Sequence, residues 1–242
     1  MQGFNCKAGL KRENGGCGTI DFVPRKQLQS LLLAVLLSAL PLATSAQNKA
    51  QLPYSIVSSY QGLFNSLKHL NLIIPSMMIS SVNPEVTPQA IEFKIKTSSG
   101  WQEFSPDENG VILFPDQPEW AELVFISNQP KGTLQLVIGF SARPLDSTSI
   151  SYQELMGLVP QFDEALTTLA TMQGQPQRKV KGLTIQLPEG SGGAVHVLSQ
   201  KGKKTLKSNS IGVVVIKLND NLWQENPPVE FDELPIGIVP LQ

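Results

Sequence analysis

The sequence predicts an α+β protein in which β-structure dominates, with two antiparallel β-sandwich-like blocks that are each preceded by a helix. Residues 90–140 contain short apolar runs separated by turn-forming clusters. Apolar and charged residues alternate over Ile91–Ile95, which is the period-two pattern of a half-buried strand. Apolar runs and turns return in the last third of the chain. We therefore expect one helix and β block over 47–145 and another over 146–242.

The first helix follows a polar lead-in at residues 47–53. Apolar residues recur at helical spacing over Ile56–Leu70. Ser55 is the expected N-cap, and Asn71 is expected to close the helix in a left-handed conformation. A short strand, Met77–Ile79, should come next.

The first β block contains two marked turns. Asp107–Gly110 combines residues that bond local backbone with residues that accept positive φ, so a tight turn is expected. A calcium loop is the alternative, but the ladder of oxygen ligands and the terminal Glu of such a loop are missing. Asn128–Gly132 is predicted to be a hairpin loop. The expected strands of this block are Ile91–Ile95, Val111–Phe114, Leu123–Ile126 and Leu134–Phe140.

The second helix begins with a capping box formed by Ser151 and Glu154. An apolar stripe then runs over Leu155–Met172, which is typical of a helix that packs on a core. Docking of a partner helix or a membrane face is the alternative for this stripe. Pro160 is expected to kink or split the helix, because it cannot donate its hydrogen bond.

The second β block contains a glycine-rich segment, Glu189–Gly193. A phosphate-binding loop would carry Gly-Lys-Ser/Thr and open a helix, whereas this segment leads into a strand, so a flexible hairpin is expected. The expected strands are Leu183–Leu187, Val195–Leu198, Thr205–Leu206, Ile211–Leu218, Val229–Phe231 and Ile236–Val239.

The two blocks share a spaced pattern that indicates an internal duplication. The alternative is two unrelated blocks that share the turn-forming residues common to hairpins. The matched residues are Phe104, Gly110, Val111 and Ile112 with Leu206, Gly212, Val213 and Val214, and then Trp120, Glu122, Phe125, Pro130 and Gly132 with Trp223, Glu225, Phe231, Pro235 and Gly237.

The N-terminus has the pattern of a secretory signal peptide over residues 1–46. Arg25 and Lys26 precede the apolar run Leu28–Leu40, and small residues follow up to an expected cleavage between Ala46 and Gln47. The apolar run is shorter than the roughly 20 residues of a transmembrane anchor, which is the alternative. Cleavage would remove Cys6 and Cys17 and leave a cysteine-free mature chain.

Translation is expected to start at Val23 rather than at Met1. Residues 1–22 lack the features of a leader, whereas a start at Val23 places Arg25 and Lys26 close to the beginning. The alternatives are a long n-region, or a cytoplasmic tail on an uncleaved anchor. The codon at position 23 and the mass of the precursor when export is blocked would decide between them.

The chain is poor in groups that carry catalysis. Its two histidines, His69 and His196, stand far apart without a zinc-binding pattern or a nucleophile elbow. Paired carboxylates occur at Asp163-Glu164 and Asp232-Glu233, but adjacent helix residues do not face each other, so the first pair is a poor acid/base couple. Carboxylates across a cleft could carry the chemistry of a carboxylate-dependent hydrolase. The sequence predicts no catalytic residue, no metal and no cofactor, and its net charge of −1 argues against nucleic acid.

Basic residues are concentrated between positions 178 and 207. Such a run can contact a lipid phosphate, an anionic glycan or an acidic partner. A solvated edge that resists aggregation is the alternative. The candidate residues for an anionic contact are Arg178, Lys179, Lys181, Lys201, Lys203, Lys204 and Lys207.

The chain resembles an uncharacterised family of small exported proteins from gammaproteobacteria. The resemblance rests on the leader, Leu52–Ser55, Phe64–Lys68, Asn128–Gly132 and Tyr152–Gly174. It implies a periplasmic or secreted protein of a Gram-negative bacterium and no particular activity. The sequence therefore favours a non-enzymatic binding or envelope-associated accessory protein, with no transmembrane span in the mature chain. A hydrolase of envelope polymers, and a structural or assembly factor with a protein partner, are the alternatives.

Overall fold

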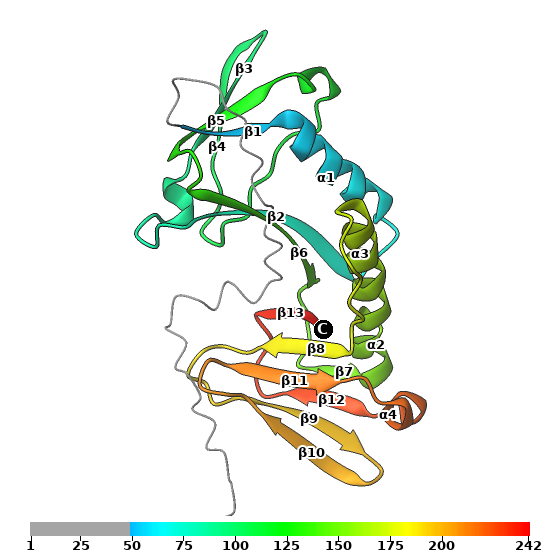
Figure 1. Cartoon of the computed structure of the whole chain (residues 1–242). Helices are drawn as coiled ribbons and strands as arrows, with labels where there is room; N and C mark the ends of the chain where they lie inside the picture. Colours follow the sequence, from blue (N-terminus) through cyan, green and yellow to red (C-terminus); the bar gives the residue numbers. More distant parts are fainter. Residues whose placement is uncertain (1–48) are drawn as a thin grey trace, which may run out of the picture.

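The computed structural model of the protein describes residues 49–242, in which antiparallel sheets dominate and the longer helices line one side (Figure 1). The predicted α+β, β-sandwich-like class is confirmed. The predicted cleavage at Ala46 and Gln47, together with Cys6 and Cys17, lies outside the described residues. No helix within residues 49–242 has both the length and the apolar character that a membrane crossing needs.

The first half of the described chain forms two sheets. One has the strand order β1-β5-β3-β4, and the other pairs β2 with β6. Val111 adds a single bridge to Met78 on the outer side of β2. The elements are β1 (Lys49–Pro53), α1 (Tyr54–Ser66), β2 (Ile73–Ser81), η2 (Pro88–Ala90), β3 (Phe93–Thr97), β4 (Gly100–Phe104), η3 (Pro118–Trp120), β5 (Val124–Pro130) and β6 (Leu134–Ala142).

The second half repeats this order of elements and pairings. Its four-stranded sheet runs β7-β12-β9-β10 and its three-stranded sheet runs β13-β8-β11, the counterparts of β1-β5-β3-β4 and of β6-β2 with Val111. The elements are β7 (Ser149–Ser151), α2 (Tyr152–Met156), α3 (Leu158–Met172), β8 (Gly182–Gln186), β9 (Ala194–Ser199), β10 (Gly202–Lys207), β11 (Val213–Lys217), α4 (Asp220–Glu225), β12 (Pro228–Phe231) and β13 (Gly237–Leu241).

The repetition extends to individual hydrogen bonds. They lie in the turn before Val111 in the first half and in the turn before β11 in the second. Asp107 Oδ1 accepts from the backbone N–H groups of Asn109 and Val111, at 2.9 and 2.8 Å. Asn209 Oδ1 accepts in the same way from Ile211 and Val213, at 3.1 and 2.9 Å. The predicted turn at Asp107–Gly110 is therefore confirmed, and its carboxylate has a structural role that an amide fills in the other half.

A buried tyrosine opens the helix of each half and fixes the same loop. The Tyr54 hydroxyl donates to Pro115 O at 3.0 Å and accepts from Gln117 N at 2.6 Å. The Tyr152 hydroxyl donates to Lys217 O at 3.1 Å and accepts from Asn219 N at 3.0 Å. Burial raises the pKa of the Tyr152 phenol, which therefore keeps its proton in the folded state.

Replacing Tyr152 by Phe is expected to lower the free energy of unfolding by about 1–3 kcal/mol, because two backbone groups lose their partner. Chemical denaturation followed by circular dichroism measures this loss. Tyr54→Phe is the matched variant and should lose a similar amount. A change close to zero in both variants would show that water replaces the hydroxyl without cost.

The strand register corrects part of the sequence match between the halves. Phe125 lies opposite Leu52, and the equivalent position opposite Ile150 belongs to Val229 instead of Phe231. In the other sheet, Ile138 and Ile238 occupy equivalent positions opposite β2 and β8. Gly132 and Gly237 are therefore not counterparts, whereas the matches at Phe104, Gly110, Val111 and Ile112 agree with the structure.

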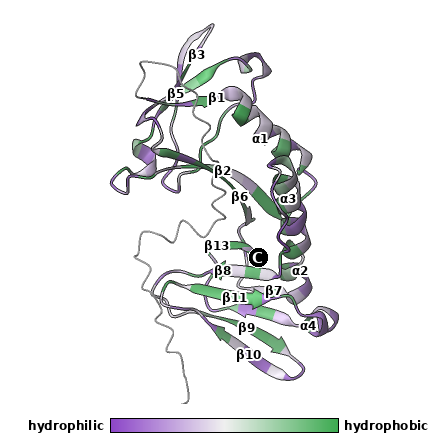
Figure 2. Ribbon diagram, viewed as in Figure 1, coloured by the Kyte–Doolittle hydropathy of each residue, from purple (hydrophilic) through white to green (hydrophobic). Residues whose placement is uncertain are grey.

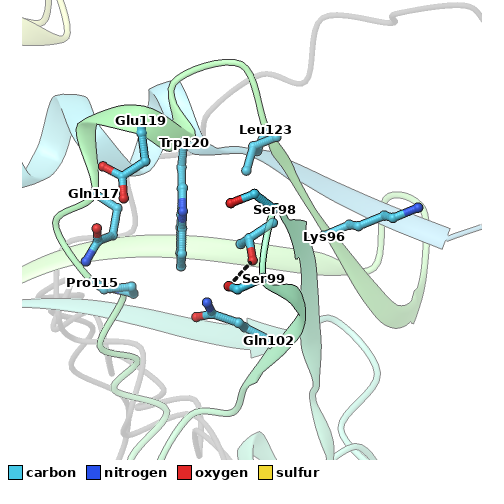
Figure 3. Close-up of a pocket in the computed structure, with 10 residues that line it drawn as sticks. Lys96, Ser98, Ser99, Gln102, Pro115, Gln117, Glu119, Trp120 and Leu123 are labelled. Carbon is cyan, nitrogen blue, oxygen red and sulfur yellow. Dashed lines mark hydrogen bonds between the residues drawn. The ribbon is translucent and has the colours of Figure 1, made fainter.

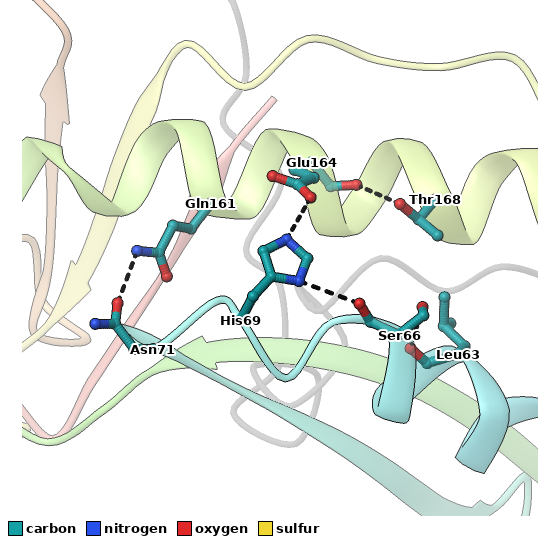
Figure 4. Close-up of polar contacts among 7 residues, drawn as sticks. All are labelled: Leu63, Ser66, His69, Asn71, Gln161, Glu164 and Thr168. Atoms are coloured by element: carbon teal, nitrogen blue, oxygen red, sulfur yellow. Dashed lines mark hydrogen bonds and ion pairs between the residues drawn. The ribbon is translucent and has the colours of Figure 1, made fainter.

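Helix α3 belongs to the second half and also contacts the first. Gln161 Oε1 accepts from Leu72 N at 2.9 Å, and the His69 ring lies 2.7 Å from a Glu164 carboxylate oxygen (Figure 4). Gln173 donates to the Tyr60 hydroxyl at 3.3 Å. The apolar residues of α3 join a hydrophobic cluster that includes residues of both halves, which supports the predicted core role of this stripe. Figure 2 shows hydrophobic and hydrophilic stretches alternating along α1 and α3.

Several predicted helix ends are wrong. Helix α1 begins at Tyr54 with Pro53 as its N-cap and ends near Leu67, so neither Ser55 nor Asn71 caps it. The second helix is interrupted at Gly157, three residues before Pro160. Pro160 then stands in the first turn of α3, where a missing N–H costs little. The Ser151 cap is confirmed, because its hydroxyl accepts from Glu154 N at 3.2 Å.

Two predicted hairpin loops connect different sheets instead. Asn128–Gly132 leads from β5 to β6, and Glu189–Gly193 leads from β8 to β9. The predicted strand over Val111–Phe114 is reduced to the bridge at Val111. Strand β4 and helix α4 were not predicted, because neither of these short elements shows a regular apolar period.

Candidate functional site

A pocket of about 470 Å³ lies in the first half, between the β3–β4 hairpin and the segment that leads into β5 (Figure 3). We call it the first-half pocket. This volume falls within the range of roughly 300–1,000 Å³ that is usual for small-molecule sites. Its lining residues are Lys96, Thr97, Ser98, Ser99, Gln102, Pro115, Gln117, Glu119, Trp120 and Leu123.

The wall that carries Gln117 and Trp120 is held by the aromatic core. The Tyr54 hydroxyl binds the backbone on both sides of Asp116, and its ring meets Trp120 edge to face at a centroid distance of 5.8 Å. Trp120 is only 6% exposed, and its indole stands in the middle of the lining residues in Figure 3. The pocket is therefore built on a rigid wall.

The opposite wall is the hairpin turn between β3 and β4. Thr97 Oγ1 lies 2.9 Å from Ser99 Oγ and donates to Gly100 O at 3.0 Å. Gln102 lies opposite Ile95, which is fully buried, so its side chain is on the core-facing side of β4. Because successive side chains of a strand point to opposite faces, the Gln102 amide lies at the pocket rather than in solvent.

Several polar side chains at the pocket have no partner in the part of the chain that the structure describes. Gln102 and Gln117 are half-buried, and neither they nor Glu119 make a side-chain hydrogen bond or ion pair within the described residues. An amide offers both a donor and an acceptor. Groups of this kind in a half-buried position are available to a bound molecule.

The equivalent turn of the second half makes a contact that the first half lacks. There the Gln200 N–H, in the β9–β10 turn, donates to the carboxylate of Glu225 at the end of α4. Their counterparts in the first half are Ser98 and Glu122, and no such bond joins these two in the described chain. The first half has a short 3-10 turn, η3, where the second half has the longer α4. Within the described residues, the two halves thus differ at this place: a hydrogen bond ties the hairpin turn to α4 in the second half, and the first half has its pocket between the turn and η3.

A histidine cluster in the second half is the nearest approach to a catalytic arrangement. His196 Nε2 lies 2.9 Å from Asp232 Oδ1, and its Nδ1 lies 3.0 Å from Thr205 Oγ1. A neutral ring that donates to Asp232 can accept from the Thr205 hydroxyl, as a general base would.

Comparison of the halves shows that this cluster has a structural counterpart. His196 and Thr205 face each other across β9 and β10, as Lys94 and Glu103 do across β3 and β4, where Nζ and Oε1 are 2.6 Å apart. Asp232 accepts from Ala194 N at 2.9 Å, just as Asn128 accepts from Glu92 N at 3.0 Å. The residues of the His196 cluster therefore occupy positions whose counterparts in the first half also join neighbouring strands.

The stability of the protein is expected to depend on Asp232 in the acid range. The hydrogen bond from His196, and then the Ala194 N–H, lower the pKa of Asp232 below its ordinary value of about 3.9, while burial opposes them. Its stabilising contribution should be present above that value and should fall as pH drops through the lowered pKa. Chemical denaturation between neutral pH and about pH 3 should show a smaller acid loss for Asp232→Asn than for the natural protein. Identical acid profiles would contradict this role.

The other sequence-predicted residues do not gather at the pocket. Asp163 accepts from Val180 N at 2.8 Å and Glu164 pairs with His69, so these adjacent carboxylates serve different contacts. Within residues 49–242, no three His, Cys, Asp or Glu side chains come together to hold a metal ion. The basic residues divide between two places: Arg178, Lys179 and Lys181 precede β8, and Lys201, Lys203, Lys204 and Lys207 lie on the β9–β10 turn and on the edge strand β10.

Sequence reasoning missed the pocket because glutamine and serine form no recognisable motif. The sequence did contain one signal for this region. The match of Trp120 and Glu122 to Trp223 and Glu225 identifies two equivalent segments, which form the short η3 in the first half and the longer α4 in the second. Comparison of the chain with family models, with curated proteins and with solved structures finds no match.

Proposed function

We propose that this chain is an exported, non-enzymatic binding protein of the bacterial envelope and that the first-half pocket is its binding site. The observation that carries the proposal is the pocket itself, where Gln102, Gln117 and Glu119 have no side-chain partner within residues 49–242. The leader pattern of residues 1–46 supports export.

The composition of the pocket favours binding over hydrolysis. Glycoside hydrolysis uses two carboxyl groups on either side of the scissile bond. Glu119 is the only carboxylate among the described residues that line the pocket. The amides and hydroxyls around it can hold and orient a molecule, but they offer no second proton donor of suitable pKa.

The binding role is tested with residues 47–242 and the water-soluble fraction of an enzymatic digest of bacterial envelopes as the probe. Protein and probe are mixed, separated by size exclusion, and the retained compounds are identified by mass spectrometry. Ser98→Trp should fill the pocket and abolish retention. Gln200→Trp alters the equivalent exposed turn of the second half and should leave retention unchanged.

Two results would overturn the binding role: no compound retained by the natural protein, or equal retention by both variants. Export is tested separately, by the N-terminal sequence of the protein recovered from a periplasmic extract. It should begin at Gln47.

A further inference from the structure

The polar groups of the first-half pocket converge on one aromatic residue. In Figure 3, Gln117 and Glu119 lie on one side of the Trp120 indole, and Ser98 and Ser99 lie on the other. Gln102 adds a second amide from β4. A molecule in this pocket therefore meets the exposed part of an indole together with hydrogen-bond donors and acceptors.

The charged side chains at the pocket limit the class of ligand that can bind. Lys96 lines the pocket, but Figure 3 shows its ammonium group pointing away from Trp120. Glu119 has no partner among the described residues and would repel an anionic group held next to it. A phosphorylated or otherwise anionic ligand is therefore disfavoured.

A purely apolar ligand is disfavoured as well. It would remove water from the two half-buried amides without replacing the hydrogen bonds, and each unpaired polar group of this kind costs about 1–3 kcal/mol. Neutral hydroxyl-bearing rings satisfy both requirements, because they carry no negative charge and their hydroxyls both donate to and accept from the amides.

We infer that the first-half pocket binds a neutral saccharide unit, with the exposed part of Trp120 in contact with the sugar and Gln102 and Gln117 bonded to its hydroxyls. This inference rests on the proposed function and specifies its ligand. The pocket volume of about 470 Å³ corresponds to the liquid volume of roughly fifteen water molecules, which is more than one sugar ring occupies.

The probes for the test are trimers of neutral hexoses and of N-acetylated hexosamines, with a uronic acid trimer as the anionic comparison. Isothermal titration calorimetry with residues 47–242 should detect saturable binding of at least one neutral trimer and weaker binding of the uronic acid trimer. Gln102→Ala and Gln117→Ala should each weaken neutral binding by about two- to tenfold, the effect of one lost hydrogen bond.

Two further variants test the role of Glu119 and provide a control in the second half. Glu119→Gln should reduce the discrimination against the uronic acid trimer, because it removes the repelling charge without changing the size of the side chain. Lys204→Ala changes the counterpart of Gln102 on β10 and should leave the affinity for the neutral trimers unchanged.

The outcomes separate this inference from the proposed function. If no neutral trimer binds while Ser98→Trp still abolishes retention of some envelope compound, the saccharide assignment is wrong and the binding role stands. If neutral trimers bind equally to the natural protein and to the Gln102 and Gln117 variants, the saccharide site lies elsewhere. If nothing binds in either experiment, both proposals fail.

Discussion

Replacing Gly212 by Ala is expected to lower the free energy of unfolding by about 2–5 kcal/mol, through a strained backbone conformation and a steric clash. Gly212 has a φ of +79°, and an added Cβ would lie 2.3 Å from the carbonyl oxygen of Leu187. That oxygen belongs to the backbone, so it cannot move away as a side chain would. Thermal and urea denaturation of the variant measure the loss.

Gly132 provides the control for this prediction. Its φ of +82° is almost the same, but an added Cβ would meet no heavy atom within 4 Å. Gly132→Ala should therefore lose only the cost of the left-handed conformation, about 1–2 kcal/mol. Equal losses in the two variants would show that the Leu187 backbone yields to the new methyl group.

Replacing Phe125 by Ala is expected to cost about 3–5 kcal/mol, because it leaves a cavity at the centre of the aromatic cluster of the first half. Phe125 is fully buried. The ring centroid of Phe114 lies 4.4 Å away, that of Phe104 5.6 Å and that of Trp120 6.5 Å. Since Trp120 packs on Phe125, the change should also loosen one wall of the first-half pocket.

Trp101 is the matched control for Phe125. It is also aromatic and also lies in the first four-stranded sheet, but it is 57% exposed. Trp101→Ala should change the stability by no more than about 0.5 kcal/mol. If the two variants lost similar amounts, the aromatic cluster would contribute less to stability than its burial implies.

Much of the fold was predictable because most strands carry a regular alternation of apolar and polar residues. Ile91, Phe93 and Ile95 are all buried, as their alternation with charged residues requires. Strand β4 lacked that signal, since Trp101 is exposed and Gln102 faces the interior side. The register that makes Val229, and not Phe231, the counterpart of Phe125 depends on pairing with a distant strand, which local sequence does not specify.

The candidate site was not predictable from the sequence for a related reason. Gln102 is brought to Gln117 and Trp120 only by the folding of the β3–β4 hairpin against the segment that Tyr54 holds. Both histidines and most of the carboxylates that the sequence did bring to attention have partners elsewhere in the chain. Asp232 and His196 bond each other, and Glu164 bonds His69 across the two halves.

The position of α3 determines how the protein should unfold. Because α3 contributes to the core of its own half and contacts β2 and β6 of the other, neither half can lose its packing without exposing apolar residues of both. Cutting the chain between β6 and β7 would leave the first half without one of its covering helices. Unfolding should therefore be a single cooperative transition despite the repeated architecture, and the slowest-exchanging amides of β2 and β8 should share one opening free energy.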